Sequence, residues 1–278
     1  MSAPGPAASP VEIAPGVIEI DTLLGGWERL TGGFLVGGAR PVLVETGSQT
    51  SVPVLLGSLG SLGVSAADLA GVVVTHIHLD HAGGVGDIAA AFPDATVYVH
   101  PKGARHLEDP TRLVDSAARV YGPRLDSLYG RLAPTPRDRL EVLEDGDSID
   151  LGGGRSLTAI DSPGHAKHHV AMMDSDTGMV FAGDAVGVLL PDGGVLRPAT
   201  PPPDFDLDLT LSSLARIAAL SPASICLTHY GLVAASPSEL LTDAADRLRE
   251  WAAEAERAWR AGEDIAEALR ARFEPEGV

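Results

Sequence analysis

The chain has 278 residues, of which 45% are hydrophobic and 21% charged, a composition that excludes general disorder. Its 38 acidic and 20 basic residues give a net charge of −18, which repels phosphate backbones and makes nucleic acid a poor partner. The single cysteine, Cys226, excludes an intrachain disulfide and a cysteine-rich zinc module.

Short apolar runs alternate with glycine-rich turns in the first hundred residues. Residues 1–10 are rich in proline, alanine and serine and lack the features of a signal peptide, so we expect a flexible tail and a cytoplasmic protein. No apolar run reaches 18 residues, so we expect no membrane contact. The pattern predicts strands over 17–20, 33–36, 41–44, 72–75 and 96–99. It predicts helices over 51–62 and 85–92.

Between residues 102 and 140 the pattern changes to charged residues and leucines at helical spacing, interrupted by prolines. We interpret this segment as a helical insertion in a domain that spans 11–235, because strand patterns resume directly after it. These strands are predicted over 148–151, 156–160, 170–173, 179–181 and 224–227. Tyr121 and Tyr129 in the insertion either line a substrate pocket or pack the insertion onto the domain.

The C-terminal part is predominantly helical. A proline-rich connector at 198–203 precedes a predicted helix over 208–220. From Pro237 the pattern predicts one long helix, or a pair broken near Gly262. We therefore expect residues 236–278 to form a helical extension packed on the domain, anchored by Trp251 and Trp259.

The strongest motif is His-Ile-His-Leu-Asp-His at residues 76–81, directly after a run of three valines. Three imidazoles and a carboxylate therefore follow a buried strand, and both groups are common metal ligands. His76 and His78 share one side of an extended segment, while Asp80 and His81 begin the next helix. One short loop can thus supply two ligands to each of two metal ions. Three histidines at these positions would arise by chance in about 1 chain in 100 of this histidine content.

This loop resembles the His-x-His-x-Asp-His hallmark of the metallo-β-lactamase superfamily. Three later elements resemble the family's remaining ligand segments, in the family's order and each at a strand end: Pro163-Gly164-His165, Gly183-Asp184 and Thr228-His229. The resemblance runs from about Val11 to Gly231. It implies an α/β (α+β) fold, a four-layer αββα sandwich with the site at one edge of its two sheets.

Position by position, the resemblance implies a site for two divalent metal ions. The first ion would be held by His76, His78 and His165, and the second by Asp80, His81 and His229, with Asp184 bridging both. All these ligands offer nitrogen or oxygen, which suits Zn²⁺ and also Fe or Mn. Glu45 stands where the family usually has an aspartate that supports the metal loop. His168 and His169 are expected to form supporting hydrogen bonds.

The implied activity is that of a glyoxalase II-like hydrolase, in which a metal-bridging hydroxide cleaves a thioester or ester of a small molecule. Asp80 and Asp184 would act in catalysis, and Tyr230 would donate a hydrogen bond to the substrate oxyanion. One alternative is a lactonase of the acyl-homoserine lactone type, and another is a persulfide dioxygenase with a single iron. The sequence leaves the substrate, the native metal and a homo-oligomeric state open.

Overall fold

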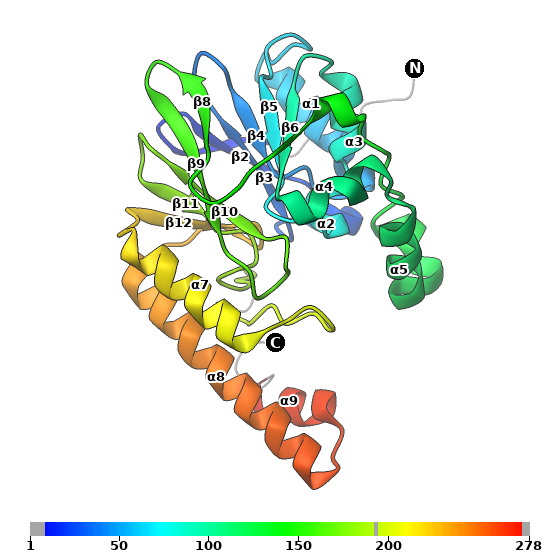
Figure 1. Ribbon diagram of the computed structural model, residues 1–278, viewed down its shortest axis with the longest axis vertical. Coiled ribbons are helices and arrows are strands. Elements are labelled where there is room, and N and C mark those ends of the chain that lie inside the picture. The colour runs from blue at the N-terminus through cyan, green and yellow to red at the C-terminus, as the bar shows by residue number, and fades with distance from the viewer. Residues whose placement is uncertain (1–8, 192–193, 274–278) are drawn as a thin grey trace.

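Two mixed β-sheets form the centre of the molecule (Figure 1). The computed structural model describes residues 9–191 and 194–273, so most of the predicted N-terminal tail lies outside the described residues. Within them, the first sheet runs in chain order: β1 (Val11–Ala14), β2 (Val17–Asp21), β3 (Gly32–Val36), β4 (Val42–Val44), β5 (Gly71–Val73), β6 (Thr96–Val99), β7 (Leu140–Val142). Its strands are antiparallel from β1 to β4 and parallel from β4 to β7.

The strands of the second sheet also lie in chain order, so each strand pairs with its neighbours in sequence. In the described part of the chain its order is β13 (Gly231–Leu232), β12 (Ser224–Leu227), β11 (Met179–Phe181), β10 (Val170–Asp174), β9 (Arg155–Asp161), β8 (Ser148–Gly152). Only β11 and β12 are paired in parallel; the other neighbours are antiparallel. All ten strands expected from the sequence are present, and the short strands β1, β7 and β13 were not predicted.

Helices cover the outer face of each sheet. The first sheet is covered by α1 (Val52–Ser61), α2 (Leu79–Ala82), α3 (Val85–Ala91) and α4 (Pro101–Glu108). The second sheet is covered by α7 (Leu207–Ala219) and α8 (Pro237–Ala261). Short 3-10 helices η1 (Leu24–Gly26) and η2 (Gln49–Ser51) lie in the loops of the first sheet. The predicted four-layer αββα sandwich is therefore confirmed.

The core has three apolar layers that follow from this stacking. The middle layer lies between the two sheets, where Phe34 of β3 packs on Phe181 of β11 with ring centroids 5.4 Å apart. Cys226 is buried in the same layer, as a small core side chain. The outer layers join the sheets to their helices, for example through Leu55 of α1 and Leu214 of α7. Burial of these side chains is the main source of stability.

Between β6 and β7 lie three helices: α4, α5 (Thr111–Tyr121) and α6 (Leu125–Leu128). They are followed by the 3-10 helix η4 (Arg137–Arg139), and η3 (Gly122–Arg124) joins α5 to α6. Leu107, Val114 and Leu125 bury their side chains in the outer layer of the first sheet. The insertion is thus packed onto the sandwich, although α5 extends away from it in Figure 1.

At the C-terminus, α8 is followed by α9 (Ile265–Phe273), and the chain turns between them at Gly262 with φ +71°. The predicted break near Gly262 is therefore correct. Leu241 and Leu248 anchor α8 to the second sheet, and its far end projects from the body (Figure 1). Trp251 stacks on Phe273 of α9, whereas Trp259 is 70% exposed. The expectation that Trp259 anchors the extension is wrong, because leucines about three to five turns earlier in α8 make the contacts with the domain.

No helix of the described residues is long and apolar enough to span a membrane.

Candidate metal centre

The seven predicted ligands converge at one edge of the sandwich, where four strands end. His76 and His78 follow β5, and the single turn α2 carries Asp80 and His81. The other three residues follow strands of the second sheet: His165 after β9, Asp184 after β11 and His229 after β12. Strand ends of both sheets thus supply the polar side chains.

Backbone hydrogen bonds join the two sheets directly beside these residues. The Val170 N–H donates to the carbonyl of Thr75 at 2.8 Å, and the Gly32 N–H donates to the carbonyl of Thr228 at 2.9 Å. Thr75 precedes His76 and Thr228 precedes His229. The relative position of the two sheets therefore sets the distance between ligands that are far apart in sequence.

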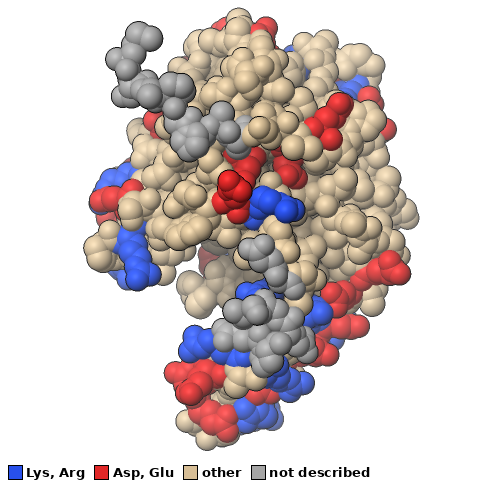
Figure 2. Space-filling model, turned by 180° about the vertical axis from the view of Figure 1, so that it is seen from behind, with Lys and Arg blue, Asp and Glu red and all other residues tan. Residues whose placement is uncertain are grey.

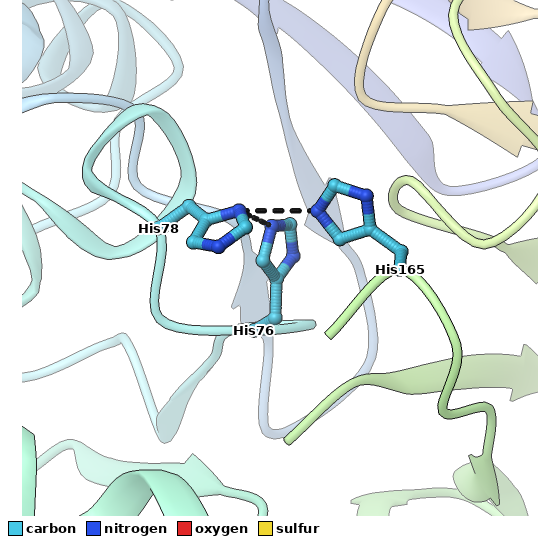
Figure 3. Close-up of side chains that lie close together, drawn as sticks. All are labelled: His76, His78 and His165. Carbon is cyan, nitrogen blue, oxygen red and sulfur yellow. Dashed lines mark hydrogen bonds between the residues drawn. The ribbon is translucent and has the colours of Figure 1, made fainter. Parts of the chain in front are cut away.

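One group of three imidazoles forms around His78 (Figure 3). The Nδ1 atom of His78 lies 2.9 Å from Nε2 of His76 and 3.1 Å from Nε2 of His165. Nitrogen ligands at 2.0–2.1 Å from a tetrahedral zinc ion are separated by about 3.3 Å. The spacing of these three nitrogens is therefore close to that of a three-histidine metal site.

A second group combines a carboxylate with two imidazoles. Oδ2 of Asp80 lies 3.9 Å from Nε2 of His81 and 3.5 Å from Nε2 of His229. These three atoms lie within 4.8 Å of one another. A third possible group joins His76, His81 and Asp184, so the seven side chains form one continuous cluster.

Asp184 lies between the two groups. Its Oδ1 atom is 3.4 Å from Nε2 of His81 and 3.7 Å from Nε2 of His229, while Oδ2 is 3.5 Å from Nε2 of His165. Each carboxylate oxygen therefore faces a different group. This is the arrangement that a bridging carboxylate requires.

The other ring nitrogen of most of these histidines has a fixed partner. The ring Nδ1 atom of His165 lies 3.0 Å from the Ala199 carbonyl, and that of His229 lies 2.7 Å from the Leu30 carbonyl. A carbonyl only accepts hydrogen bonds, so both Nδ1 atoms carry hydrogen and both Nε2 lone pairs face the centre. Neither carbonyl was predicted, because loops distant in sequence supply them.

Glu45 is fully buried and supports the loop of residues 76–81. Its Oε1 atom accepts a hydrogen bond from the Thr75 N–H at 3.1 Å, and Oε2 lies 3.4 Å from Nδ1 of His81. The longer side chain of glutamate therefore reaches both the strand end and the imidazole. This matches the supporting role expected for the position.

His169 holds Asp184 through the backbone. Its Nε2 atom accepts a hydrogen bond from the Asp184 N–H at 3.1 Å, and its Nδ1 atom lies 2.8 Å from the hydroxyl of Ser162. Gly183 has φ +49°, and a Cβ atom there would lie 2.6 Å from this imidazole and 2.6 Å from Oγ1 of Thr75. Only glycine allows this close approach.

His168 contacts the loop of residues 76–81 more weakly, through the Ile77 N–H at 3.4 Å.

The electrostatics of the two groups differ. Burial and repulsion from His165 lower the pKa of His78 to about 4, and burial lowers the pKa of His76 well below its usual range. Burial acts in the same direction on His81, but Asp184, Asp80 and Glu45 raise the pKa of His81 well above its usual value. His76 and His78 are therefore neutral imidazoles, whereas His81 is held in its charged form by the carboxylates around it.

Several buried polar atoms of the centre lack a hydrogen-bond partner, which tests whether a cation fits there. Five buried side-chain nitrogen or oxygen atoms of the described residues lack a hydrogen-bond partner. Four of them belong here: Oε2 of Glu45, both ring nitrogens of His81 and Oδ1 of Asp184. Oε2 of Glu45 and Nδ1 of His81 face each other at 3.4 Å as an ion pair, so the atoms that face the ligand groups are Nε2 of His81 and Oδ1 of Asp184. Buried polar atoms are normally satisfied, so these two call for a partner of another kind. Divalent metal ions fit this donor set of imidazoles and carboxylates.

Tyr230 does not face this centre in the structure. Its hydroxyl is hydrogen-bonded to Glu19, and burial together with the charge of Glu19 raises its pKa. The guanidinium of Arg29 lies 5.1 Å from the centre of its ring. A donor role toward substrate would require the hydroxyl to leave Glu19.

A shallow pocket of about 370 Å³ adjoins His229. It is lined by both apolar and charged side chains: Trp27, Glu28, Arg29, Leu30, Leu190 and Pro191. Leu30 also supplies the carbonyl that bonds His229, and the Leu189 N–H donates to the His229 carbonyl at 2.5 Å. The pocket therefore borders the backbone that positions His229, although none of the seven converging residues lines it.

Tyr129 of the insertion packs against the core of the first sheet and lies near Asp80. Burial and the charge of Asp80 raise the pKa of Tyr129, whose ring packs on Tyr121 at 4.6 Å between centroids. Tyr121 itself is 39% exposed. Of the two readings for this pair, the structure thus places Tyr129 near the centre and Tyr121 behind it.

Comparison with known proteins assigns the sandwich to a family. The family model described as the metallo-beta-lactamase superfamily matches residues 31–229, which contain all seven converging residues. Among curated proteins, the chain is 34% identical over 166 residues to the metallo-beta-lactamase fold-containing protein ST1585 of Sulfurisphaera tokodaii, covering 58% of this chain and 60% of that one. It is also 34% identical over 164 residues to the acyl-coenzyme A thioesterase MBLAC2 of Bos taurus, covering 54% and 56%.

Solved structures show the same architecture. The archaeal metallo-beta-lactamase superfamily protein ST1585 from Sulfolobus tokodaii superposes with a TM-score of 0.71 at 26% identity, over 85% of this chain and 86% of that one. The subclass B3 metallo-beta-lactamase MEM-A1, from a soil metagenome library, gives a TM-score of 0.63 at 20% identity, over 90% and 98%, which is a likeness of fold alone. The sequence matches span about 60% or less of the length of these curated relatives.

Proposed function

The chain belongs to the metallo-β-lactamase superfamily, and we propose that it is a hydrolase that uses two divalent metal ions to cleave a thioester or ester of a small molecule. The observation that carries this proposal is the position of Asp184, whose two oxygens face the two separate ligand groups. A site for a single ion would not require the second group of possible ligands, Asp80, His81 and His229.

The proposed ligands are His76, His78 and His165 for one ion and Asp80, His81 and His229 for the other, with Asp184 shared. When bound, such a pair of ions lowers the pKa of water and polarises the substrate carbonyl. Zn²⁺ is the ion we favour, with Fe and Mn as alternatives that the same donors accept.

The protein's own contribution is orientation and proton handling. The carbonyls of Ala199 and Leu30 and the carboxylate of Glu45 fix the imidazole rings, so that the ligand nitrogens need no rearrangement. The Asp80 side chain is 24% exposed, compared with 8% for Asp184. Burial alone would raise the pKa of Asp80, but His81 and His229 hold it well below its usual range, so the carboxylate stays ionised. With Oδ2 in the second ligand group, the other carboxylate oxygen could accept a hydrogen bond from an attacking water, which suits the catalytic role proposed for Asp80.

The substrate is proposed to lie in the pocket beside His229. Trp27, Leu190 and Pro191 offer apolar contacts, and Arg29 offers one positive charge. A thioester with an extended apolar or amide-containing arm fits such a wall. Two relatives support this substrate class by their names: the acyl-coenzyme A thioesterase, and a hydroxyacylglutathione hydrolase of Bdellovibrio bacteriovorus that is 28% identical over 149 residues, 52% of this chain and 47% of that one.

The two alternatives need different features. A lactonase would use the same seven residues and gain from a Tyr230 hydroxyl that faces the substrate, whereas this hydroxyl is bonded to Glu19. A persulfide dioxygenase needs only one iron on a smaller ligand set. It would therefore not explain why Asp80, His81 and His229 form a second group of possible ligands. Both are therefore weaker proposals than the thioesterase.

The decisive experiment is a substrate panel on purified protein. Acyl-coenzyme A esters, S-lactoylglutathione, p-nitrophenyl esters and acyl-homoserine lactones would be assayed before chelation, after it, and after reloading with Zn²⁺, Mn²⁺ or Fe²⁺. We expect thioester cleavage that chelation removes and about two metal ions per chain restore. Lactones as the preferred substrates would favour the lactonase, and one iron per chain with oxygen consumption would favour the dioxygenase. No metal-dependent activity on any substrate would refute the proposal.

A further inference from the structure

Glu19 of β2 carries a carboxylate toward the apolar layer between the two sheets. Side chains alternate along a strand, so Glu19 shares its face with Val17, which is buried in that layer. Across the strands it pairs with Phe34, which is buried there too. A carboxylate beside apolar side chains loses water and needs polar partners, and Glu19 finds them at the edge of the second sheet.

Two hydrogen bonds join Glu19 to the segment that follows His229. The carboxylate accepts one from the Tyr230 hydroxyl and one from the Leu232 N–H. Gly231 lies between these two donors in sequence, with φ +70°, and a Cβ atom there would overlap Oε2 of Glu19. The start of β13 is therefore shaped to admit this carboxylate, because glycine leaves the space that a side chain would fill.

Tyr230 also contacts the loop that orients the imidazole of His229. The guanidinium of Arg29 lies 5.1 Å from the centre of the Tyr230 ring, and its charge acts on Glu19 as well. The next residue, Leu30, supplies the carbonyl that lies 2.7 Å from Nδ1 of His229. The three side chains thus hold both the backbone after His229 and the acceptor of its ring.

We propose that Glu19 and Tyr230 are positioning residues that hold His229 in the orientation of a metal ligand, an inference that rests on the proposed function. The Tyr230 hydroxyl then serves the site through Glu19 and not through a contact with substrate. The Leu189 N–H also holds this segment, by donating to the His229 carbonyl, but that contact is made by backbone. The contact with Glu19 is made by side chains, so substitution can remove it.

Nitrogen-15 NMR of the histidine rings in metal-free protein tests the orientation directly. The hydrogen on Nδ1 of His229 is bonded to the Leu30 carbonyl, so we expect it to exchange slowly with water in the wild type. Tyr230→Phe keeps the aromatic ring but removes the hydroxyl that Glu19 accepts. It should speed this exchange about 3- to 10-fold, the effect of losing one hydrogen bond.

Tyr98→Phe is the matched control for this measurement. Tyr98 is likewise half-buried, and its hydroxyl is hydrogen-bonded to Thr96. Its ring lies against Gly71, at the end of β5 that is remote from His76. Equal exchange at His229 in Tyr230→Phe and in Tyr98→Phe would overturn the proposal.

Titration with Zn²⁺ then measures the effect on each metal ligand, because an imidazole signal shifts when its nitrogen binds the ion. We expect Glu19→Ala to raise the Zn²⁺ concentration at which His229 shifts by about 10- to 100-fold, and that for His78 by less than about twofold. Glu12→Ala is the control, at an exposed glutamate on β1 that also accepts a backbone N–H, from Gly16 at 3.0 Å. An equal loss at both histidines would indicate general damage to the fold and contradict the positioning role.

A conservative variant covers the case in which Glu19→Ala does not fold. Glu19→Gln keeps an oxygen that can accept from Tyr230 or from Leu232, so His229 should bind Zn²⁺ within about threefold of the wild type. A loss as large as that expected for Glu19→Ala would show that hydrogen bonding by Glu19 does not hold the ring. If His229 of the wild type does not respond to Zn²⁺, the proposed function fails, whereas the exchange measured in metal-free protein still decides whether Glu19 and Tyr230 position His229.

Discussion

The metal centre and the C-terminal helices both concentrate charge, but they hold it differently. In the metal centre, His81 and Asp184 are buried and lack ordinary hydrogen-bond partners. On α8 and α9, most acidic and basic side chains form pairs in water, such as Arg257 with Glu263, each about half exposed. The exception is Glu254, which is 6% exposed and pairs with Arg257 and Arg272. Figure 2 shows this mixture of charges on the part of the molecule that the helices form.

The difference teaches where charge determines stability and function. A buried charge without a partner costs several kcal/mol, so the centre must be completed by a cation or by protons. In an exposed ion pair, water solvates both charges whether or not they are paired, so the pair contributes little to the free energy of unfolding. Substitutions in the two regions should therefore differ in their effects by orders of magnitude.

The largest effect is expected from Asp184→Asn. The amide keeps the shape of the side chain but removes the charge that faces both ligand groups, so we expect kcat/KM to fall by about 10³-fold or more. The variant should also bind fewer metal ions, as measured by elemental analysis, than the about two ions per chain that we expect for the wild type. Asp246→Asn, at an exposed pair on α8, is the control. Undiminished activity of Asp184→Asn would disprove the bridging role.

A second buried charge tests the stability side of the comparison without involving metal. Arg155 donates two hydrogen bonds to the fully buried Asp174, at 2.8 and 2.7 Å. Asp174→Ala leaves this guanidinium unpaired and should reduce the free energy of unfolding by about 3–5 kcal/mol. Glu256→Ala, at an exposed pair with Arg260 on α8, should change the free energy of unfolding by less than about 0.5 kcal/mol.

The effect of Asp174 should depend on pH in one direction. Burial alone would raise its pKa, but hydrogen bonds from Arg155 and Thr177 lower it below its usual value. The folded pKa is thus below the unfolded value of about 3.9, so the stabilisation is complete above that pH and is lost as pH falls toward the folded value. The difference in stability between wild type and Asp174→Ala should be constant from about pH 5 to 8 and shrink below about pH 4. A constant difference down to pH 2 would contradict this assignment.

The site was largely predictable from the sequence, and for identifiable reasons. The motif at residues 76–81 needs only a strand end and one helical turn, so its four side chains converge locally. His165, Asp184 and His229 lie at other strand ends, and single residues there carry little signal without the family resemblance. The Leu30 and Ala199 carbonyls, and the hydrogen bond of Tyr230 to Glu19, depend on how distant loops meet, which local patterns do not specify.

The fold showed the same division. Strands with buried valines and isoleucines were predictable, whereas β1, β7 and β13 are largely exposed or half-buried and were not. Trp259 was misplaced because a tryptophan in a helical pattern does not reveal whether its side of the helix has a neighbour.

An intermediate effect is expected one step away from the ligands, at Glu45. Glu45→Gln keeps one oxygen for the Thr75 N–H but no longer offers a charge to Nδ1 of His81. Metal affinity, measured by competition with a chromophoric chelator, should fall about 10- to 100-fold. Glu45→Asp keeps the charge on a shorter side chain, so its metal affinity should lie between those of the wild type and Glu45→Gln. Glu250→Gln on α8 is the exposed control; equal affinities for all four proteins would show that Glu45 only fills space.

The smallest effect is expected in the C-terminal helices. Glu263→Gln removes the carboxylate that Arg257 contacts at 2.7 Å, but both side chains are about half exposed. Because water replaces the lost partner, the melting temperature should change by less than about 1 °C, and that small change should vanish in about 1 M salt. Calorimetry at low and high salt measures both. A shift of several degrees that survives high salt would mean that α9 is held by its charges and not by Trp251 and Phe273, and the contrast between the two regions would then be wrong.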